Sequence, residues 1–256
     1  MKPARRRWLQ AAAAAALAGR ATADTLPATV ARVKPSVLPV GTFSPTDNPR
    51  FGFRGTGFVV GDGTLVATNA HVLPEAADAP GGPRLAVMTA RNASGGELRP
   101  VRVAATDREH DLALLRFEGP PLPALALDET DRAREGQAIA LTGFPLGGAL
   151  GFSPVTHRGI VSALTPIALP SPTAQQLDAR AIARLRSGAF EVLQLDATAY
   201  PGNSGGPVYD ADSGSVLGVV NMVLVKGTRE SAIATPTGIS YAIPVRWLRE
   251  LLAQTR

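Results

Sequence analysis

Residues 201–207 read Pro-Gly-Asn-Ser-Gly-Gly-Pro, and the rest of the chain is interpreted from this stretch. One hydroxyl, that of Ser204, lies among three glycines, with a proline at either end. Glycine carries no Cβ, so successive backbone N–H groups can turn toward one point. If the N–H groups of Gly202 and Ser204 converge, with Asn203 between them, they form an oxyanion hole for attack by the Ser204 hydroxyl. The alternative is a plain tight turn between two strands, which the heptad alone does not exclude.

A histidine and an aspartate upstream favour the catalytic interpretation. His71 follows an apolar run at 65–67, so its ring can lie at the end of a strand. The chain has three histidines and no cysteine, and no two histidines lie four residues apart, so a zinc site is not indicated and we expect no metal. Asp111 opens the apolar run Asp-Leu-Ala-Leu-Leu, and a carboxylate that enters an interior needs a partner. We expect that partner to be His71.

The order of the three residues restricts the fold. Asp111 lies 40 residues after His71, and Ser204 lies 93 residues after Asp111. Residues 202–206 also match the Gly-x-Ser-x-Gly pattern of α/β-hydrolases, but there the acid and the histidine follow the serine, and no histidine follows Ser204. The order base, acid, nucleophile matches a two-barrel arrangement, with base and acid in the first barrel and the nucleophile in the second. We therefore predict a catalytic triad of His71, Asp111 and Ser204 between two barrels.

The texture of the chain agrees with this arrangement. From Val37 onward, short apolar or alternating runs are broken by Gly, Pro, Asp and Asn, which is typical of antiparallel strands. The sequence predicts an all-β fold of two six-stranded antiparallel β-barrels with the active site between them, plus a short C-terminal helix. Strands are expected at 37–43, 55–60, 64–68, 85–90, 98–106 and 111–117 in barrel 1 (about 32–125), and at 138–143, 155–164, 190–195, 206–209, 216–225 and 239–243 in barrel 2 (about 136–244).

Two segments have helical periodicity. Residues 245–255 place Val245, Leu248 and Leu252 on one face, which we expect to dock on barrel 2. The other segment, 173–186, follows three prolines and carries apolar residues at every fourth position. An inserted helix of this kind could be a lid, a subunit contact or a surface decoration, and the sequence leaves all three open.

The N-terminus predicts export. Basic residues precede an apolar run that is too short to span a bilayer, and Ala-Thr-Ala at 21–23 fits a cleavage site, so residues 1–23 are predicted to be a signal peptide. Arg5-Arg6-Arg7-Trp8-Leu9 resembles a twin-arginine signal, with a general secretory signal as the alternative; either route leads to the periplasm or outside the cell. The mature chain then carries 21 basic and 21 acidic residues and no membrane segment, which gives no reason to expect nucleic acid as a partner.

Taken together, these motifs resemble the trypsin-like serine proteases, and within them the HtrA/Deg branch. The resemblance rests on the stretches around His71, Asp111 and Ser204 and on Gly55-Thr56-Gly57-Phe58, Gly143-Phe144-Pro145, Gly159-Ile160-Val161-Ser162 and Gly238-Ile239-Ser240-Tyr241. The relatives usually continue into a PDZ domain, whereas only residues 245–256 follow the last predicted strand here. We therefore expect a protease domain alone, and the resemblance leaves the oligomeric state open.

The resemblance implies a serine endopeptidase that acts on polypeptides through an acyl-enzyme and needs no cofactor. It places the walls of the primary substrate pocket at Thr198, Ala199, Tyr200, Asn221, Met222, Val223, Gly238 and Ile239. None of these residues is charged, which predicts cleavage after small or medium apolar residues of unfolded or flexible chains. Two alternatives remain: a binding or chaperone-like module on the same fold, and an esterase with the same triad.

Overall fold

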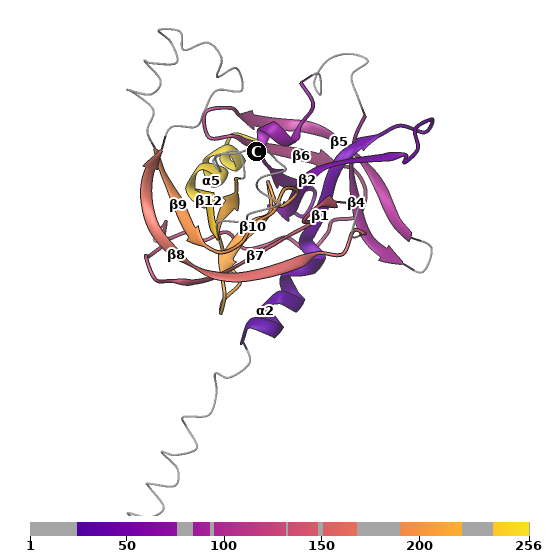
Figure 1. The fold of residues 1–256 in the computed structure, drawn as a ribbon. Coiled ribbons are helices and arrows are strands. Elements are labelled where there is room, and N and C mark those ends of the chain that lie inside the picture. The colour runs from indigo at the N-terminus through magenta and orange to yellow at the C-terminus, as the bar shows by residue number, and fades with distance from the viewer. Residues whose placement is uncertain are drawn as a thin grey trace, which may run out of the picture.

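Two closed barrels, each of six antiparallel strands, make up the fold (Figure 1). The computed structural model describes residues 25–75, 84–92, 95–131, 133–147, 151–167, 190–221 and 238–255. Barrel 1 consists of β1 (Val37–Phe43), β2 (Phe51–Val60), β3 (Leu65–Thr68), β4 (Arg84–Asn92), β5 (Gly95–Asp107) and β6 (Leu112–Phe117). Barrel 2 consists of β7 (Ala138–Gly143), β8 (Val155–Ile167), β9 (Phe190–Asp196), β10 (Pro207–Asp210), β11 (Val216–Val220) and β12 (Ile239–Pro244). The predicted all-β, two-barrel fold is confirmed.

Both barrels have the same topology, although no internal sequence repeat predicts it. Barrel 1 closes in the order β1-β2-β3-β6-β5-β4, and barrel 2 closes in the corresponding order β7-β8-β9-β12-β11-β10. Closure pairs every strand on both sides, so no backbone edge is left open to another chain. Short strands such as β3 and β11 are buried along their whole length, which explains why their sequences are mostly apolar.

The C-terminal helix α5 (Val245–Ala253) joins the two barrels. It contacts β11 and β12 of barrel 2, as predicted, but also β5 and β6 of barrel 1. Its buried residues are Val245, Leu248 and Leu251, and the predicted Leu252 is partly buried and packs against the same core. The largest apolar cluster contains residues of both barrels and of this helix, so the barrels share a core beside their junction.

An N-terminal helix, α2 (Thr25–Val33), was not predicted. It leads through a short 3-10 turn, η1 (Lys34–Ser36), into β1. The Thr29 hydroxyl donates to the backbone oxygen of Asp212, and the Arg32 guanidinium donates to that of Ser213. These contacts hold the segment before barrel 1 against the β10–β11 turn of barrel 2.

Most predicted strand bounds agree with the structure to within a few residues, and one difference concerns the site. Strand β6 begins at Leu112, because Asp111 has φ +55° and cannot continue a strand. The predicted signal peptide, the predicted helix at 173–186 and the end of the strand predicted at 216–225 lie outside the described residues. Among the described helices, none is long and apolar enough to cross a membrane.

Candidate active site

His71 and Asp111 form a pair with two contacts. His71 lies on a single 3-10 turn, η2 (Ala70–Val72), which directly follows β3. Its backbone N–H donates to Asp111 Oδ1 at 2.8 Å, and its ring Nδ1 lies 2.5 Å from Asp111 Oδ2. A carboxylate accepts, so Nδ1 carries the proton and Nε2 keeps its lone pair. The His71 side chain is 30% exposed, and its second nitrogen is therefore chemically usable as a base.

The turn that carries Asp111 is fixed on its other sides as well. The Asp111 carbonyl accepts hydrogen bonds from the Ala70 N–H and from the Asn69 side-chain amide. Such contacts hold a non-glycine residue at positive φ, a conformation that costs of order 1–3 kcal/mol when unsupported. The strained backbone aims the carboxylate at the ring rather than into the barrel.

Asn221 is a contact of the acid that sequence reasoning assigned elsewhere. We expected it in the wall of the substrate pocket, but its side-chain amide donates to Asp111 Oδ2 at 2.7 Å. Asn221 is fully buried and directly follows β11, so it reaches the acid of barrel 1 from barrel 2. No local pattern signals this contact, because the two residues are 110 positions apart.

Ser204 lies in the turn between β9 and β10, against the segment that carries His71. The Ser204 carbonyl accepts the Thr56 N–H at 2.9 Å, and a Cβ at Gly205 would lie only 3.1 Å from the backbone nitrogen of Asn69. The next amide, Gly205 N–H, donates to the carbonyl of Val220, the residue before Asn221. Within the described residues, the Ser204 hydroxyl has no hydrogen bond to the His71 ring.

The loop before Ser204 adopts a conformation that only glycine accepts readily. Gly202 has φ +105°, and a Cβ there would lie 2.3 Å from the Phe144 carbonyl oxygen. The Asn203 N–H donates to the Tyr200 carbonyl and is therefore occupied within the loop. In the part of the chain that the structure describes, the N–H groups of Gly202 and Ser204 have no acceptor.

The family model of the trypsin-like peptidase domain matches residues 55–219. The chain belongs to this family. Its curated relatives include a mitochondrial serine protease HTRA2 of Drosophila pseudoobscura pseudoobscura, 30% identical over 78% of this chain and 38% of the relative. They also include a probable periplasmic DegP-like serine endoprotease of Pseudomonas fluorescens, 29% identical over 75% of this chain and 32% of the relative. The chain thus spans about a third of the length of these relatives.

Two solved protease structures share the fold of this peptidase domain. The serine endoprotease from Yersinia pestis matches with a TM-score of 0.63 at 20% identity, over 91% of this chain and 67% of that chain. The HtrA-type protease AlgW with a tripeptide matches with a TM-score of 0.63 at 22% identity, over 90% of this chain and 63% of that chain. At these identities the likeness is one of fold.

The described part of the expected substrate pocket lies beside the Ser204 loop of the peptidase domain. Ala199 is buried and Thr198 and Tyr200 are partly buried, whereas Ile239 is 46% exposed. The Ser240 hydroxyl accepts the Ala199 N–H and donates to the carbonyl of Ala197, so it joins the two predicted walls. Gly238 contributes its carbonyl, which accepts the Ala197 N–H. The other two predicted residues, Met222 and Val223, lie outside the described residues.

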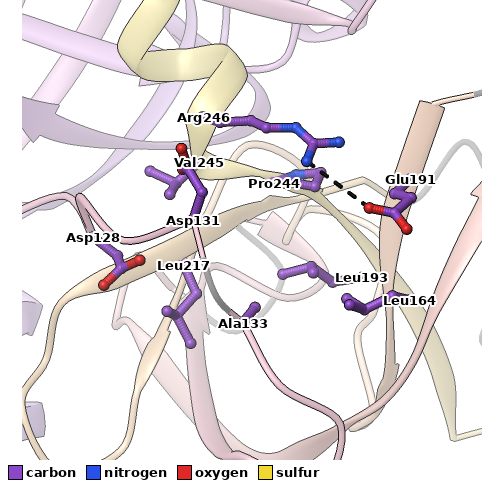
Figure 2. Close-up of a pocket in the computed structure, with 10 residues that line it drawn as sticks. All are labelled: Asp128, Asp131, Ala133, Leu164, Glu191, Leu193, Leu217, Pro244, Val245 and Arg246. Carbon is purple, nitrogen blue, oxygen red and sulfur yellow. Dashed lines mark ion pairs between the residues drawn. The ribbon is translucent and has the colours of Figure 1, made fainter.

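A hollow whose lining includes none of the predicted site residues lies between the segment that links the barrels, strands β8, β9 and β11, and the start of α5 (Figure 2). Its charged groups have partners: Arg246 lies 3.9 Å from Glu191, and Asp131 accepts from Arg249. Its lining contains neither serine nor histidine, so it does not hold a second serine–histidine pair. Its lining is Asp128, Asp131, Ala133, Leu164, Glu191, Leu193, Leu217, Pro244, Val245 and Arg246. Nowhere in the described ranges do three His, Asp or Glu side chains gather as a metal site requires.

Proposed function

We propose that the chain is a serine endopeptidase in which Ser204 is the nucleophile, His71 the general base and Asp111 the group that orients the base. The observation that carries this proposal is the arrangement of Asp111. Its Oδ2 contacts the His71 ring and the Asn221 amide, and its Oδ1 accepts the His71 N–H. A carboxylate that accepts hydrogen bonds from both the backbone N–H and the ring Nδ1 of His71 fixes the tautomer of the ring, which a general base requires.

The reaction follows from that tautomer. Nε2 of His71 takes the Ser204 proton as the serine oxygen attacks a peptide carbonyl, and His71 then gives the proton to the leaving amine. The N–H groups of Gly202 and Ser204 hold the oxyanion, and each such donor is worth roughly 10²- to 10³-fold in rate. The Asn203 N–H donates to the Tyr200 carbonyl within the loop and so does not bind the oxyanion. Water, activated by the same histidine, releases the acyl-enzyme.

The pocket residues support a preference for small or medium apolar residues before the cleaved bond. A pocket for Lys or Arg needs a buried carboxylate, because an unpaired buried cation is costly. The proposed walls, Thr198, Ala199, Tyr200, Gly238 and Ile239, carry none, and the nearest acid, Asp196, is exposed. Val, Ala, Ile and Leu are mostly buried in folded proteins, so we propose unfolded or flexible polypeptides as substrates.

We also propose that residues 1–23 direct export. The names of the relatives support two destinations, periplasm and mitochondrion. The short apolar run and the small-residue site of this chain support cleavage before Asp24. N-terminal sequencing of the protein recovered from the periplasm of an exporting bacterium tests this, and a sequence that begins at Met1 would contradict it.

The decisive experiment incubates the purified protein, and its Ser204→Ala variant, with denatured casein and identifies the fragments by mass spectrometry. We expect fragments from the wild type alone, cut after Val, Ala, Ile or Leu. Cuts mainly after Lys or Arg would contradict the pocket assignment. Hydrolysis of small esters without fragments would indicate an esterase, and suppression of casein aggregation without fragments would indicate a chaperone-like module.

A further inference from the structure

The side-chain hydroxyl of Thr56 connects the two barrels at the loop that precedes Ser204. Thr56 lies in β2 of barrel 1 and is fully buried. Its Oγ1 donates to the Gly202 carbonyl at 2.6 Å and accepts the Phe144 N–H, at the end of β7, at 3.1 Å. Three segments that are distant in sequence therefore meet at one oxygen atom.

The chemistry of the two partners fixes the direction of these hydrogen bonds. A backbone N–H can only donate and a carbonyl can only accept, so the Thr56 proton must point at Gly202. The hydroxyl has no freedom to rotate while both contacts last. A buried hydrogen bond of this kind is costly to remove because its partners lose water as well as each other.

The backbone of Thr56 adds a second contact to the same loop. Its N–H donates to the Ser204 carbonyl at 2.9 Å. Thr56 thus holds the carbonyl groups of both residues whose N–H groups form the proposed oxyanion hole. The peptide unit before Gly202 is held as well, because the Leu146 N–H donates to the Pro201 carbonyl at 2.8 Å.

Gly202 is the residue in this loop that most needs such support. At φ +105° it occupies a region that glycine enters and leaves freely, so its own backbone preference does not fix the loop. Leu146 fixes the peptide unit on one side of Gly202, and the Thr56 hydroxyl fixes the peptide unit on the other. The first unit carries the Gly202 N–H, and the second carries the Asn203 N–H, which donates to the Tyr200 carbonyl. Without the hydroxyl, the second unit keeps only that contact, and the unit after it, which carries the Ser204 N–H, is held less firmly on the side of Gly202.

We propose that Thr56 is a positioning residue that keeps the Ser204 N–H directed at the oxyanion. Its side-chain hydroxyl holds the peptide unit before the one that carries this N–H, and its backbone N–H holds the peptide unit after it. The inference rests on the proposed function, since it assigns a task in that reaction. It predicts that the hydroxyl stabilises the transition state and contributes little to substrate binding, because the oxyanion forms only after the bound substrate is attacked.

The test compares Thr56→Val, which keeps the shape and removes the hydroxyl, with Thr56→Ser, which keeps the hydroxyl. Kinetics are measured on the casein peptide that the wild type cleaves best. For Thr56→Val we expect kcat to fall roughly 10- to 100-fold with KM within about threefold, less than the loss of a whole oxyanion donor. Affinity for a peptide boronate, whose tetrahedral adduct occupies the oxyanion hole, should fall by the same factor as kcat/KM. Thr56→Ser should recover most of kcat.

Thr142→Val is a matched control for the loss of a buried hydroxyl. Thr142 is fully buried in β7, and its hydroxyl bonds to Thr156 and Tyr209 rather than to the Ser204 loop. We expect this variant to lower the melting temperature while kcat stays within about threefold of the wild type. If Thr56→Val does not fold, Thr56→Cys replaces it, because a thiol of similar size is only a weak donor.

Two outcomes overturn the inference while the proposed function stands. One is a folded Thr56→Val variant with a kcat within threefold of the wild type. The other is a lower kcat/KM that comes from a higher KM alone, with kcat and the boronate affinity unchanged. A wild type that cleaves no peptide overturns the proposed function and the inference with it.

Discussion

The part of the chain that the structure describes contains two histidine–aspartate pairs of nearly the same local geometry. In the first pair, Asp111 accepts the His71 N–H on Oδ1 and contacts ring Nδ1 through Oδ2 at 2.5 Å. In the second, Asp107 accepts the His110 N–H on Oδ1 and contacts ring Nδ1 through Oδ2 at 2.7 Å. The first pair joins residues 40 positions apart, whereas the second joins residues only three positions apart.

The surroundings of the two rings differ. The His110 ring stacks on Trp247 of α5, with centroids 3.8 Å apart, and meets the edge of Phe190 at 4.8 Å. Its side chain is 11% exposed, against 30% for His71. His110 thus attaches the turn before Asp111 to barrel 2, while His71 lies at the junction beside Ser204. A histidine–aspartate pair becomes catalytic only where its second nitrogen can reach a nucleophile.

The largest expected effect is the loss of kcat on removal of the nucleophile or of the histidine of the first pair. Ser204→Ala or His71→Ala should lower kcat by about 10⁶-fold, because the triad acts as a unit. Neither variant removes a core side chain, so the melting temperature should stay close to that of the wild type. Peptidase activity above a tenth of the wild-type value, with contaminating proteases excluded by active-site labelling, would contradict the assignment.

The second expected effect concerns the acid of the first pair. Asp111→Asn should lower kcat by about 10⁴-fold, because an amide can donate to Nδ1 and so stabilise the wrong tautomer. The matching change in the second pair, Asp107→Asn, should leave kcat within about tenfold, because that ring has no proton to transfer in the proposed reaction. Equal losses in the two variants, measured at equal folded fractions, would remove the distinction between the pairs.

A third effect measures what barrel 2 adds to the catalytic pair. Asn221→Ala removes one hydrogen bond to Asp111 Oδ2, a bond to a charged group worth roughly 1.5–3 kcal/mol. We expect a kcat loss of about tenfold, smaller than that of Asp111→Asn because the contacts to His71 remain. A higher KM with an unchanged kcat would indicate that Asn221 lies in the wall of the substrate pocket, as predicted from the sequence.

The sequence predicted most of the fold because strand signals are local. Alternation and the Gly and Pro breaks located all twelve strands, and the order of His71, Asp111 and Ser204 suggested how they divide into two barrels. The prediction that Asp111 opens a strand was wrong, since the pattern of apolar residues after it says nothing about its own φ.

Features that depend on distant contacts were missed. Asn221 reaches an acid 110 residues away, and Thr29 of α2 binds a turn 183 residues away. α5 docks on both barrels because the barrels lie side by side, which its own periodicity cannot reveal. The sequence identified the residue types of the site, whereas the contacts that orient them exist only in the folded chain.

The fourth prediction tests the structural pair directly. His110→Gln keeps a polar group but loses the stack on Trp247 and weakens the contact to Asp107. We expect the free energy of unfolding to fall by about 1–2 kcal/mol, with kcat within about threefold once folded protein is counted. Urea unfolding and active-site titration measure the two quantities. A kcat loss as large as that of Asp111→Asn would show that the two pairs are not functionally distinct.

The smallest expected effect belongs to the third histidine, His157, which has no carboxylate partner among the described residues. It lies in β8, with its ring 5.9 Å from that of Tyr200 and its Nε2 buried without a hydrogen bond in the described part of the chain. Burial lowers the pKa of His157 below its ordinary value of 6.5. Below pH 6.5 the unfolded chain therefore binds a proton that the folded chain does not bind, so the free energy of unfolding falls as the pH drops.

Comparison of wild type and His157→Gln between pH 7 and pH 5 measures this contribution. We expect the melting temperature of the wild type to fall about 1–3 °C more than that of the variant. Two carboxyls with lowered pKa values stay ionised in this window. The Thr64 hydroxyl lowers the pKa of Asp62 from 3.8. Burial raises the pKa of Asp210, but its hydrogen bonds, among them those from Ser213, lower that pKa by more. The stabilisation that these two carboxyls give is lost only as the pH falls below about 4. A carboxyl whose pKa is lower in the folded chain stabilises the fold at any pH above its unfolded pKa, and this stabilisation is lost as the pH falls through the folded pKa. If the melting temperatures of the two proteins fall equally from pH 7 to pH 5, the pKa of His157 is the same in the folded and the unfolded chain, which contradicts the prediction.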